Sequence, residues 1–306
     1  MRASLIQIAV DPDESVDSRR RRAAALVREQ RGADLVVLPE LWPVGAFAYE
    51  SFADEAETTD GPTFREMSKA ASDAGVWLHA GSIVERAADG QTPDGQTPDG
   101  QTPDGQTPDG QTPDGLNPDG QTPDGPAPDG TLYNTSLVLS PTGELVGTYR
   151  KIHRFGFDKG EATLMGAGGE LVTVRLPETT LGLATCYDLR FPELFRGLVD
   201  AGAETLVVPA GWPARRRAHW TLLARARAVE NQAYVLACAT AGTHAGVEQS
   251  GHSIVVDPWG EVLAEAGTDE EVLTVDLDPG TVATTRERFP ALKDRRLGLE
   301  TPPANR

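Results

Sequence analysis

Two kinds of apolar pattern alternate along this chain. Short apolar runs, such as Asp34–Leu38 and Thr205–Pro209, have the length and composition of buried strands. Longer segments with helical spacing lie between them; one is Pro62–Ala74, which begins with a proline and is followed by Gly75. Strands that alternate with helices and hairpins predict an α/β fold with mixed sheets.

The same reasoning places the other regular elements. The expected strands are Ser4–Val10, Trp77–Val84, Leu132–Leu139 and Ala233–Ala239, the expected helices are Ser15–Arg31, Pro192–Ala201 and Arg216–Asn231, a hairpin is expected at Leu137–Tyr149, and further strands are expected over Ser253–Asp276. Ser15 is a suitable N-cap for the first helix. A chain of 306 residues can bury a large core with these elements.

A tandem repeat interrupts this pattern. Residues 91–130 consist of eight pentapeptides, six of which read Gln-Thr-Pro-Asp-Gly. Each unit combines a Pro-Asp-Gly turn signal with almost no apolar side chain, so the array cannot bury enough surface to offset the entropy of ordering it. Strand-like segments flank the array on both sides. We therefore predict one domain over residues 1–280, a flexible insertion within it at 89–130, and a C-terminal tail at 281–306.

The net charge of −18 limits the classes of partner. Phosphate binding needs a basic face, so the charge argues against nucleic acid. A calcium site made of the repeated aspartates is an alternative, but their period and the prolines do not match known calcium loops. No apolar run reaches the length of about 18 residues that suggests a membrane span, and the first residues read as a strand instead of a signal peptide. With two cysteines and no disulfide framework, we expect a cytoplasmic protein.

Three reactive side chains stand where apolar, strand-like runs end: Glu40, Lys151 and Cys186. In α/β folds, such strand ends are where functional sites are built. A cysteine that faces a helix start, here the one at Pro192, tends to ionise and to act as a nucleophile. A glutamate with apolar neighbours suits a general base, and a fixed ammonium stabilises an oxyanion and helps a nearby thiol to ionise. The three together predict nucleophilic catalysis at a carbonyl carbon.

Each residue also has a simpler interpretation. A lone cysteine is commonly a small buried hydrophobic residue, as we expect for Cys238. Glu40 could be an ordinary loop carboxylate and Lys151 an exposed residue at a strand end. A Cys–His pair with His153 or His219 is a further alternative, although neither histidine lies in a recognisable partner motif. No Cys/His cluster has zinc spacing, and no glycine-rich phosphate loop follows the first strand.

The order and spacing of three segments resemble a known superfamily. Leu-Pro-Glu40, Tyr-Arg-Lys151-Ile-His and Cys186-Tyr-Asp-Leu-Arg-Phe-Pro-Glu-Leu are similar to the three signature segments of the nitrilase superfamily of carbon–nitrogen hydrolases. The similarity runs from Ser4 to about Asp278 once the repeat is set aside. Three such segments in the right order are far more specific than any one of them.

The resemblance implies a mechanism and a fold. Cys186 matches the nucleophile of the family, Glu40 its general base and Lys151 the lysine that stabilises the oxyanion, with the backbone N–H of Tyr187 as the second donor. Glu161 matches a further glutamate that many members have after the lysine. The implied fold is a four-layer α-β-β-α sandwich, and the implied chemistry uses no metal or organic cofactor. Members usually pair through the helices near the nucleophile, so a homodimer is expected.

The residues after the nucleophile indicate a branch of the superfamily. Members that act on nitriles tend to have Cys-Trp-Glu there and carbamoylases Cys-Asn-Asp-Arg-Arg, whereas this segment resembles the amidase branch that includes omega-amidase and deaminated-glutathione amidase. Those enzymes act on small amides that bear a carboxylate. Arginine binds carboxylates bidentately, so Arg190 is a candidate substrate contact, as are Arg215, Arg216 and Arg217. A nitrilase, an N-carbamoyl amidohydrolase and a non-enzymatic protein that binds through the acidic repeat are the alternatives.

Overall fold

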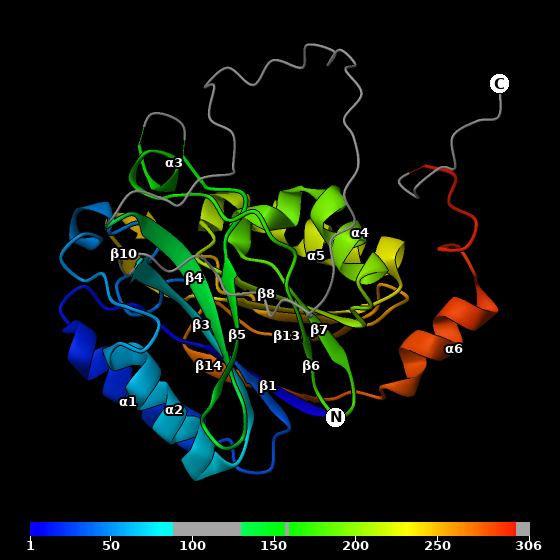
Figure 1. The fold of residues 1–306 in the computed structure, drawn as a ribbon, viewed down its shortest axis with the longest axis horizontal. Helices are drawn as coiled ribbons and strands as arrows, with labels where there is room; N and C mark the ends of the chain where they lie inside the picture. The colour runs from blue at the N-terminus through cyan, green and yellow to red at the C-terminus, as the bar shows by residue number, and fades with distance from the viewer. Residues whose placement is uncertain (88–129, 157–158, 298–306) are drawn as a thin grey trace, which may run out of the picture.

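Two six-stranded sheets lie face to face at the centre of the molecule (Figure 1). The computed structural model describes residues 1–87, 130–156 and 159–297. The predicted insertion at 89–130 lies outside these residues, apart from Gly130, and so does the end of the predicted tail.

The first sheet combines the N-terminal strands with the last strand of the chain. Its order is β14 (Glu271–Asp276), β1 (Arg2–Gln7), β2 (Leu35–Val37), β3 (Trp77–Arg86), β4 (Leu132–Leu139) and β5 (Leu145–Arg150). The central strands β1, β2 and β3 are parallel, and the other pairs are antiparallel. The sheet is therefore mixed, as the alternation of helical connections and hairpins predicts.

The second sheet repeats this design with later segments of the chain. Its order is β13 (Val262–Glu265), β12 (Ile254–Val256), β9 (Tyr234–Ala239), β8 (Thr205–Ala210), β7 (Thr180–Leu183) and β6 (Thr173–Arg175). Here β7, β8 and β9 are parallel and the edge pairs are antiparallel. Cys186 follows a parallel strand of this sheet, whereas Glu40 follows a parallel strand of the first sheet.

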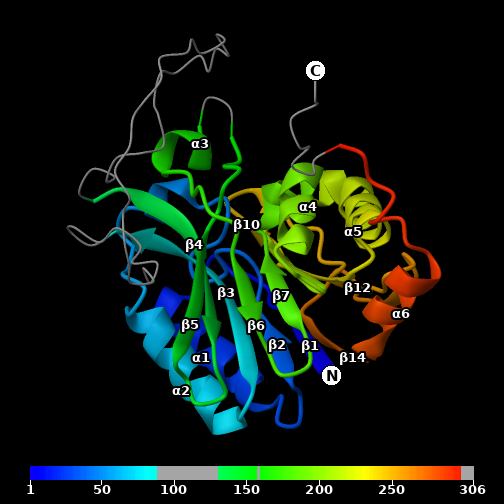
Figure 2. The same ribbon diagram turned by 45° about the vertical axis from the view of Figure 1, so that its right-hand side comes forward.

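Helices cover the outer face of each sheet and complete four layers (Figure 2). The pair α1 (Val16–Arg28) and α2 (Pro62–Ala74) packs on the first sheet, and the pair α4 (Pro192–Asp200) and α5 (Arg217–Asn231) packs on the second. The short elements are η1 (Tyr49–Ser51), α3 (Glu161–Leu164), η2 (Cys186–Arg190), η3 (Ala214–Arg216), β10 (Thr243–His244) and β11 (Val247–Glu248). The arrangement confirms the predicted α-β-β-α sandwich.

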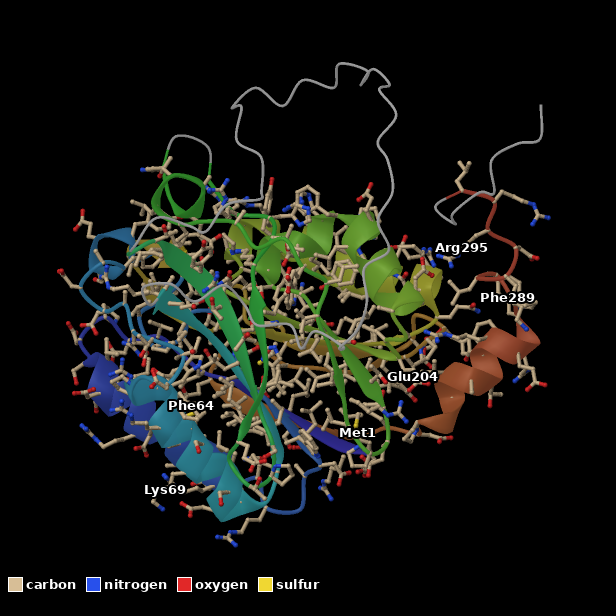
Figure 3. The ribbon with its side chains drawn as sticks, viewed as in Figure 1. Met1, Phe64, Lys69, Glu204, Phe289 and Arg295 are labelled. Carbon is tan, nitrogen blue, oxygen red and sulfur yellow. The ribbon has the colours of Figure 1, made fainter. Side chains whose placement is uncertain are left out.

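The space between the sheets is filled by side chains from both of them (Figure 3). Leu5 and Val37 of the first sheet belong to the same buried cluster as Val207 and Leu236 of the second. Cys238 lies in this layer, with its Sγ 3.4 Å from carbonyl oxygens of the opposite sheet. Because both faces of the central strands are covered, these strands read as unbroken apolar runs instead of alternating ones.

Most predicted elements are present with small shifts at their ends. The helix at Pro62–Ala74 has the predicted bounds, and Gly75 follows it with a φ of 72°, the left-handed conformation that favours glycine at this position. The side chain of Ser15 caps α1 as expected, accepting a hydrogen bond from the N–H of Ser18. The strand expected to run up to Cys186 ends earlier, at Leu183.

The described part of the predicted tail contains a helix that packs on the second half of the molecule. Helix α6 (Gly280–Arg288) buries Val282, and its Arg286 donates hydrogen bonds to the carbonyl oxygens of Ala203 and Gln232. Among the described residues, no helix has the length and apolar character needed to cross a membrane.

Candidate active site

Cys186 is held in an uncommon backbone conformation at the start of η2. Its φ is +47°, a region that residues other than glycine rarely adopt and that is found most often at functional sites. Thr185 and Asp188 form a capping box around it: the N–H of Thr185 donates to Asp188 Oδ2 over 2.8 Å, and the Thr185 side chain accepts from the N–H of Asp188. The nucleophile candidate therefore begins a short 3-10 helix instead of ending a strand.

Asp188 also ties this short helix to the end of β5. Its carboxylate accepts hydrogen bonds from the Tyr149 hydroxyl at 2.6 Å and from the backbone N–H of His153 at 3.0 Å, and it contacts His153 Nδ1 at 2.7 Å. Burial, followed by the charge of Asp188, raises the pKa of Tyr149 well above its usual value, so the hydroxyl keeps its proton. Asp188 thus fixes the position of the Cys186 segment relative to the segment of Lys151.

The two histidines of the Cys–His alternative lie in other contacts. His153 is the partner of Asp188, and its ring stacks on Phe191 with centroids 3.7 Å apart. His219 lies beside Arg190, with its Nδ1 3.4 Å from a guanidinium nitrogen. Within the described residues, neither histidine forms a hydrogen bond with Cys186, so the structure gives that alternative no support.

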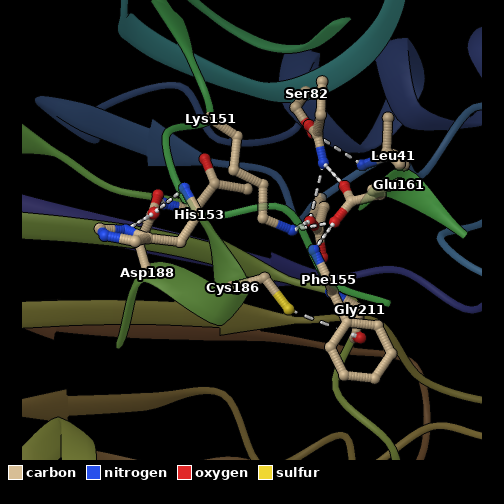
Figure 4. A network of polar contacts seen from close by, with 12 residues as sticks. Leu41, Ser82, Lys151, His153, Phe155, Glu161, Cys186, Asp188 and Gly211 are labelled. Carbon is tan, nitrogen blue, oxygen red and sulfur yellow. Dashed lines mark hydrogen bonds and ion pairs between the residues drawn. The ribbon is translucent and has the colours of Figure 1, made fainter. Parts of the chain in front are cut away.

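Glu40, Lys151 and Glu161 converge on one buried cluster, although they belong to three separate segments. Figure 4 shows Lys151 and Glu161 pointing toward each other. The Nζ of Lys151 lies 2.6 Å from Glu40 Oε1 and 2.6 Å from Glu161 Oε2. Burial lowers the pKa of Lys151, but the negative charges of Glu161 and Glu40 outweigh it and hold that pKa well above its usual value. An ammonium has three N–H groups, so one remains for a further acceptor after these two contacts.

The surroundings of Glu40 differ from the apolar setting that its sequence neighbours suggest. Asn134 Nδ2 donates to its Oε1 over 2.8 Å, and the backbone N–H of Gly211 donates to its Oε2 over 2.7 Å. Its apolar sequence neighbours, Leu41 and Trp42, are buried elsewhere. Leu41 adopts a φ of 43°, and the indole N–H of Trp42 donates a hydrogen bond to the carbonyl oxygen of Ala80. The carboxylate is therefore held by polar donors inside an apolar shell.

The Cys186 thiol is neutral in this environment. Its side chain is buried, with Sγ 3.8 Å from the carbonyl oxygen of Gly211. Burial and then the charge of Glu40 raise the pKa of Cys186 well above its usual value, and the charge of Lys151 opposes them only in part. Lys151 lowers the pKa of the thiol, as expected, but burial disfavours the thiolate more than this charge favours it.

Glu161, in contrast, behaves as a second buried acid next to the first. Burial and the charge of Glu40 raise its pKa, while Lys151 and the hydrogen bond from Asn134 act in the opposite direction. The backbone N–H of Phe155 also donates to its Oε2, over 2.8 Å. The two carboxylates share one cation, so the cluster of Glu40, Glu161 and Lys151 has a formal charge of −1 when both acids are ionised.

A pocket that is partly open to solvent gives access to this cluster. Its lining includes Glu40, Lys151, Glu161 and Cys186, an aromatic wall, and two arginines; the wall and the arginines are Phe47, Phe155, Tyr187, Trp212, Arg190 and Arg216. Tyr187 is the second residue of η2, and the N–H groups of a first helical turn have no partner within the helix. Its N–H remains the predicted second oxyanion donor.

The family model described as carbon-nitrogen hydrolase matches residues 2–98 and 121–287. This chain belongs to the carbon-nitrogen hydrolase family. It is 38% identical over 299 residues to the 2-oxoglutaramate amidase of Paenarthrobacter nicotinovorans, covering 96% of this chain and 89% of that protein. It is 34% identical to the omega-amidase NIT2 of Mus musculus, covering 98% and 96%. The solved structure of Saccharomyces cerevisiae Nit3, a nitrilase-superfamily member, has a TM-score of 0.75 at 29% identity, covering 97% and 96%.

These likenesses confirm the superfamily and the class of enzyme. The relatives of this carbon-nitrogen hydrolase are named amidases, so the chain is a hydrolase that acts on amides. The alternative of a non-enzymatic protein loses its basis. No cluster of three metal-ligating side chains occurs among the described residues of the hydrolase.

Two polar groups of the site were not found by sequence reasoning. Asn134 lies in the segment Leu132-Tyr-Asn-Thr-Ser, which takes part in the superfamily resemblance but has no reactive group to attract notice. Gly211 contributes its backbone N–H and C=O to Glu40 and Cys186, and backbone groups leave no chemical signal in a sequence. The position of each at the end of a strand or within one was the only available indication.

Proposed function

We propose that this hydrolase cleaves the amide of a small, carboxylate-bearing molecule through a thioester on Cys186, with release of ammonia. The observation that supports it most is that a thiol, a carboxylate and an ammonium group, those of Cys186, Glu40 and Lys151, line one pocket. The names of the relatives, 2-oxoglutaramate amidase and omega-amidase, favour an amide over a nitrile or a carbamoyl group.

In the first half-reaction, the sulfur of Cys186 attacks the amide carbon while Glu40 takes the thiol proton. The transfer has to accompany the attack because burial keeps the thiol neutral. The third N–H of Lys151 and the N–H of Tyr187 stabilise the negative charge on the carbonyl oxygen. The C–N bond then breaks, Glu40 returns the proton to the departing nitrogen, and ammonia leaves.

In the second half-reaction, water replaces the amine. Glu40 takes a proton from the water molecule, the oxygen attacks the thioester carbon, and the C–S bond breaks as the proton passes to sulfur. One water is consumed, and a carboxylic acid and a neutral thiol result. Glu161 holds Lys151 in place through its 2.6 Å contact, and its remaining acceptor site suits the leaving amine.

The two pocket arginines support a substrate with a carboxylate. The guanidinium of Arg190 lies 5.0 Å from the Trp212 ring and that of Arg216 lies 5.0 Å from the Phe155 ring. Within the described residues, neither arginine forms an ion pair, whereas Arg217 is paired with Glu265 at 2.8 Å. Two unpaired cations on an acidic protein, at the mouth of one pocket, fit an anionic group of the substrate. Arg190 and Arg216 are therefore the preferred substrate contacts.

The test is intact-mass spectrometry combined with an ammonia assay. Wild-type protein is incubated with 2-oxoglutaramate, which has a carboxylate, and with butyramide, which has none. We expect ammonia release with a marked preference for 2-oxoglutaramate, and an acyl adduct on the wild-type chain that Cys186→Ala does not form. Cys238→Ala is the matched control, since Cys238 is buried between the sheets. Turnover by Cys186→Ala would disprove the thioester mechanism, and equal rates for both amides would disprove the carboxylate preference.

A homodimer is part of the proposal and rests on the family and on an exposed apolar stripe. Leu222 and Val229 lie two turns apart on one side of α5, and they are 65% and 51% exposed. Pairing through α4 and α5, as in the family, would cover them. Light scattering should show a dimer that Leu222→Asp weakens; a monomeric wild-type protein would refute the assembly without touching the chemistry.

A further inference from the structure

Asn134 occupies a place in the site that the reaction scheme above does not use. It lies in β4, next to the strand that ends before Lys151, and it is 3% exposed. Its Nδ2 donates one hydrogen bond to Glu40 Oε1, at 2.8 Å, and another to Glu161 Oε1. The backbone carbonyl oxygen of Asn134 accepts a hydrogen bond from the backbone N–H of Lys151 at 2.9 Å. One residue therefore touches all three charged members of the cluster.

The orientation of the Asn134 amide is fixed by the two carboxylates. Both hydrogens of the NH₂ group are used, and the opposite orientation would place Oδ1 against two negatively charged oxygens. The Oδ1 atom is buried and has no hydrogen-bond partner among the described residues. A buried acceptor without a partner is unfavourable. Its persistence here indicates that the two donor contacts determine how the side chain lies.

These contacts distribute the open acceptor sites of Glu40 unequally. A carboxylate oxygen has about two lone-pair sites. Oε1 accepts from Lys151 at 2.6 Å and from Asn134 at 2.8 Å, so both of its sites are occupied. Among the described residues, Oε2 accepts a hydrogen bond from the N–H of Gly211, and its other site lies toward the Cys186 thiol, whose sulfur is 3.8 Å from the C=O of the same glycine. The open acceptor site of the carboxylate is therefore on Oε2, the oxygen that accepts from Gly211, the residue beside the thiol.

We propose that Asn134 is a positioning residue that directs the proton carried by Glu40 to Oε2, on the side of Cys186. By filling the second site of Oε1, Asn134 leaves Oε2 as the oxygen able to receive a proton. An uncharged donor suits this task, because a second cation would stabilise the carboxylates so strongly that proton uptake by Glu40 would become unfavourable. The inference rests on the proposed function, since it assumes that Glu40 moves protons.

Removing the Asn134 amide should shift the pH profile of activity in a definite direction. The hydrogen bond from Asn134 lowers the pKa of Glu161, so its loss moves protonation of that carboxyl to higher pH. The acid limb of the kcat/KM profile reports the loss of ionised carboxylate in this cluster. It should therefore shift to higher pH in a variant that lacks the amide. A residue with only a structural role would lower stability and leave the position of the limb unchanged.

The experiment compares pH profiles of 2-oxoglutaramate hydrolysis for three variants of the full chain. We expect Asn134→Ala to move the acid limb upward by about one pH unit and to lower kcat by about 10- to 100-fold. Asn134→Asp keeps the volume but adds a third carboxylate, so its limb should move further. Thr135→Val is the matched control, because Thr135 lies on the same strand, is equally buried, and donates to Glu85 outside the pocket.

The outcomes distinguish a failure of the positioning role of Asn134 from a failure of the proposed function. An unshifted acid limb in active Asn134 variants, with activity lost only in proportion to thermal stability, overturns the positioning role. An equal shift in Thr135→Val also overturns it. If Asn134→Ala does not fold, the isosteric Asn134→Asp gives the same decision. A wild-type protein that releases no ammonia from any amide overturns the proposed function itself, and the inference with it.

Discussion

Two buried carboxylates near the pocket, Asp188 and Glu40, differ in how fully their oxygens are occupied. Each oxygen of Asp188 has two partners, from Thr185, His153 and Tyr149. Among the residues that the structure describes, Glu40 has two hydrogen-bond donors at Oε1 and one backbone donor at Oε2. Since a carboxylate has about four acceptor sites in total, Asp188 is saturated and Glu40 retains one site.

The comparison teaches that burial alone does not identify a reactive acid. Both carboxylates are almost completely inaccessible, and both connect the end of β5 to another element. Asp188 faces only donors, so it stabilises the loop that holds the nucleophile. Glu40 has donors at both sites of Oε1 but at one site of Oε2, so it can exchange a proton through Oε2. The number of open acceptor sites separates a structural role from a chemical one.

Glu40→Gln is the change that should separate the two carboxylates most strongly. Loss of the base is expected to lower kcat by about 10²- to 10⁴-fold. Thermal stability should fall less than in Asp188→Asn, because the new NH₂ group would face one donor, the N–H of Gly211, and Lys151 keeps its contact with Glu161. Ammonia release and the melting temperature are measured on the same preparation. Glu85→Gln is the matched control, since Glu85 is a buried glutamate paired with Arg150 outside the pocket. Near-normal turnover in Glu40→Gln would favour a Cys–His mechanism instead.

The fold and the three main site residues could be predicted from the sequence for a physical reason. Strands that are covered on both faces must be unbroken apolar runs, so the places where they end are visible, and Glu40 follows such a strand, β2. Lys151 follows β5, a half-exposed strand at the sheet edge, which the hairpin signal before it made recognisable. The local signals at Ser15 and Gly75 act within a few residues of themselves, so they could be assigned without tertiary structure.

The parts that could not be predicted depend on contacts between distant segments. The neutral state of Cys186 results from burial between layers, which a helix start nearby in sequence cannot reveal. Strand β7 ends early, and Cys186 adopts a φ of +47°. Both features accompany the four contacts of the Asp188 carboxylate, whose partners lie up to 39 residues away in the sequence. The role of Gly211 is carried by backbone atoms only.

Asp188→Asn should show the opposite balance from the change at Glu40. The amide has one acceptor oxygen in place of two, so its NH₂ group faces N–H or O–H donors that had donated hydrogen bonds to the carboxylate. Hydrogen bonds to charged groups contribute about 1.5–3 kcal/mol each, and we expect the free energy of unfolding to fall by at least about 2 kcal/mol. Urea unfolding at fixed protein concentration measures this. Unchanged stability with abolished activity would place Asp188 in the chemistry and break the comparison.

Tyr149→Phe should give the smallest effect and test a single contact of the saturated carboxylate. It removes the 2.6 Å hydrogen bond to Asp188, together with the 3.3 Å one that the hydroxyl accepts from the N–H of Ile152, and leaves the other partners of Asp188 in place. We expect a loss of about 1 kcal/mol in the free energy of unfolding and an unchanged acid limb in the activity profile. Because the pKa of Tyr149 is raised, its hydroxyl stays protonated and the loss should be the same from about pH 6 to pH 9. Tyr133→Phe is the control, since the Tyr133 ring packs under Arg150 at 4.1 Å. A loss that grows with pH would mean that the hydroxyl titrates and that Asp188 is less completely occupied than the geometry indicates.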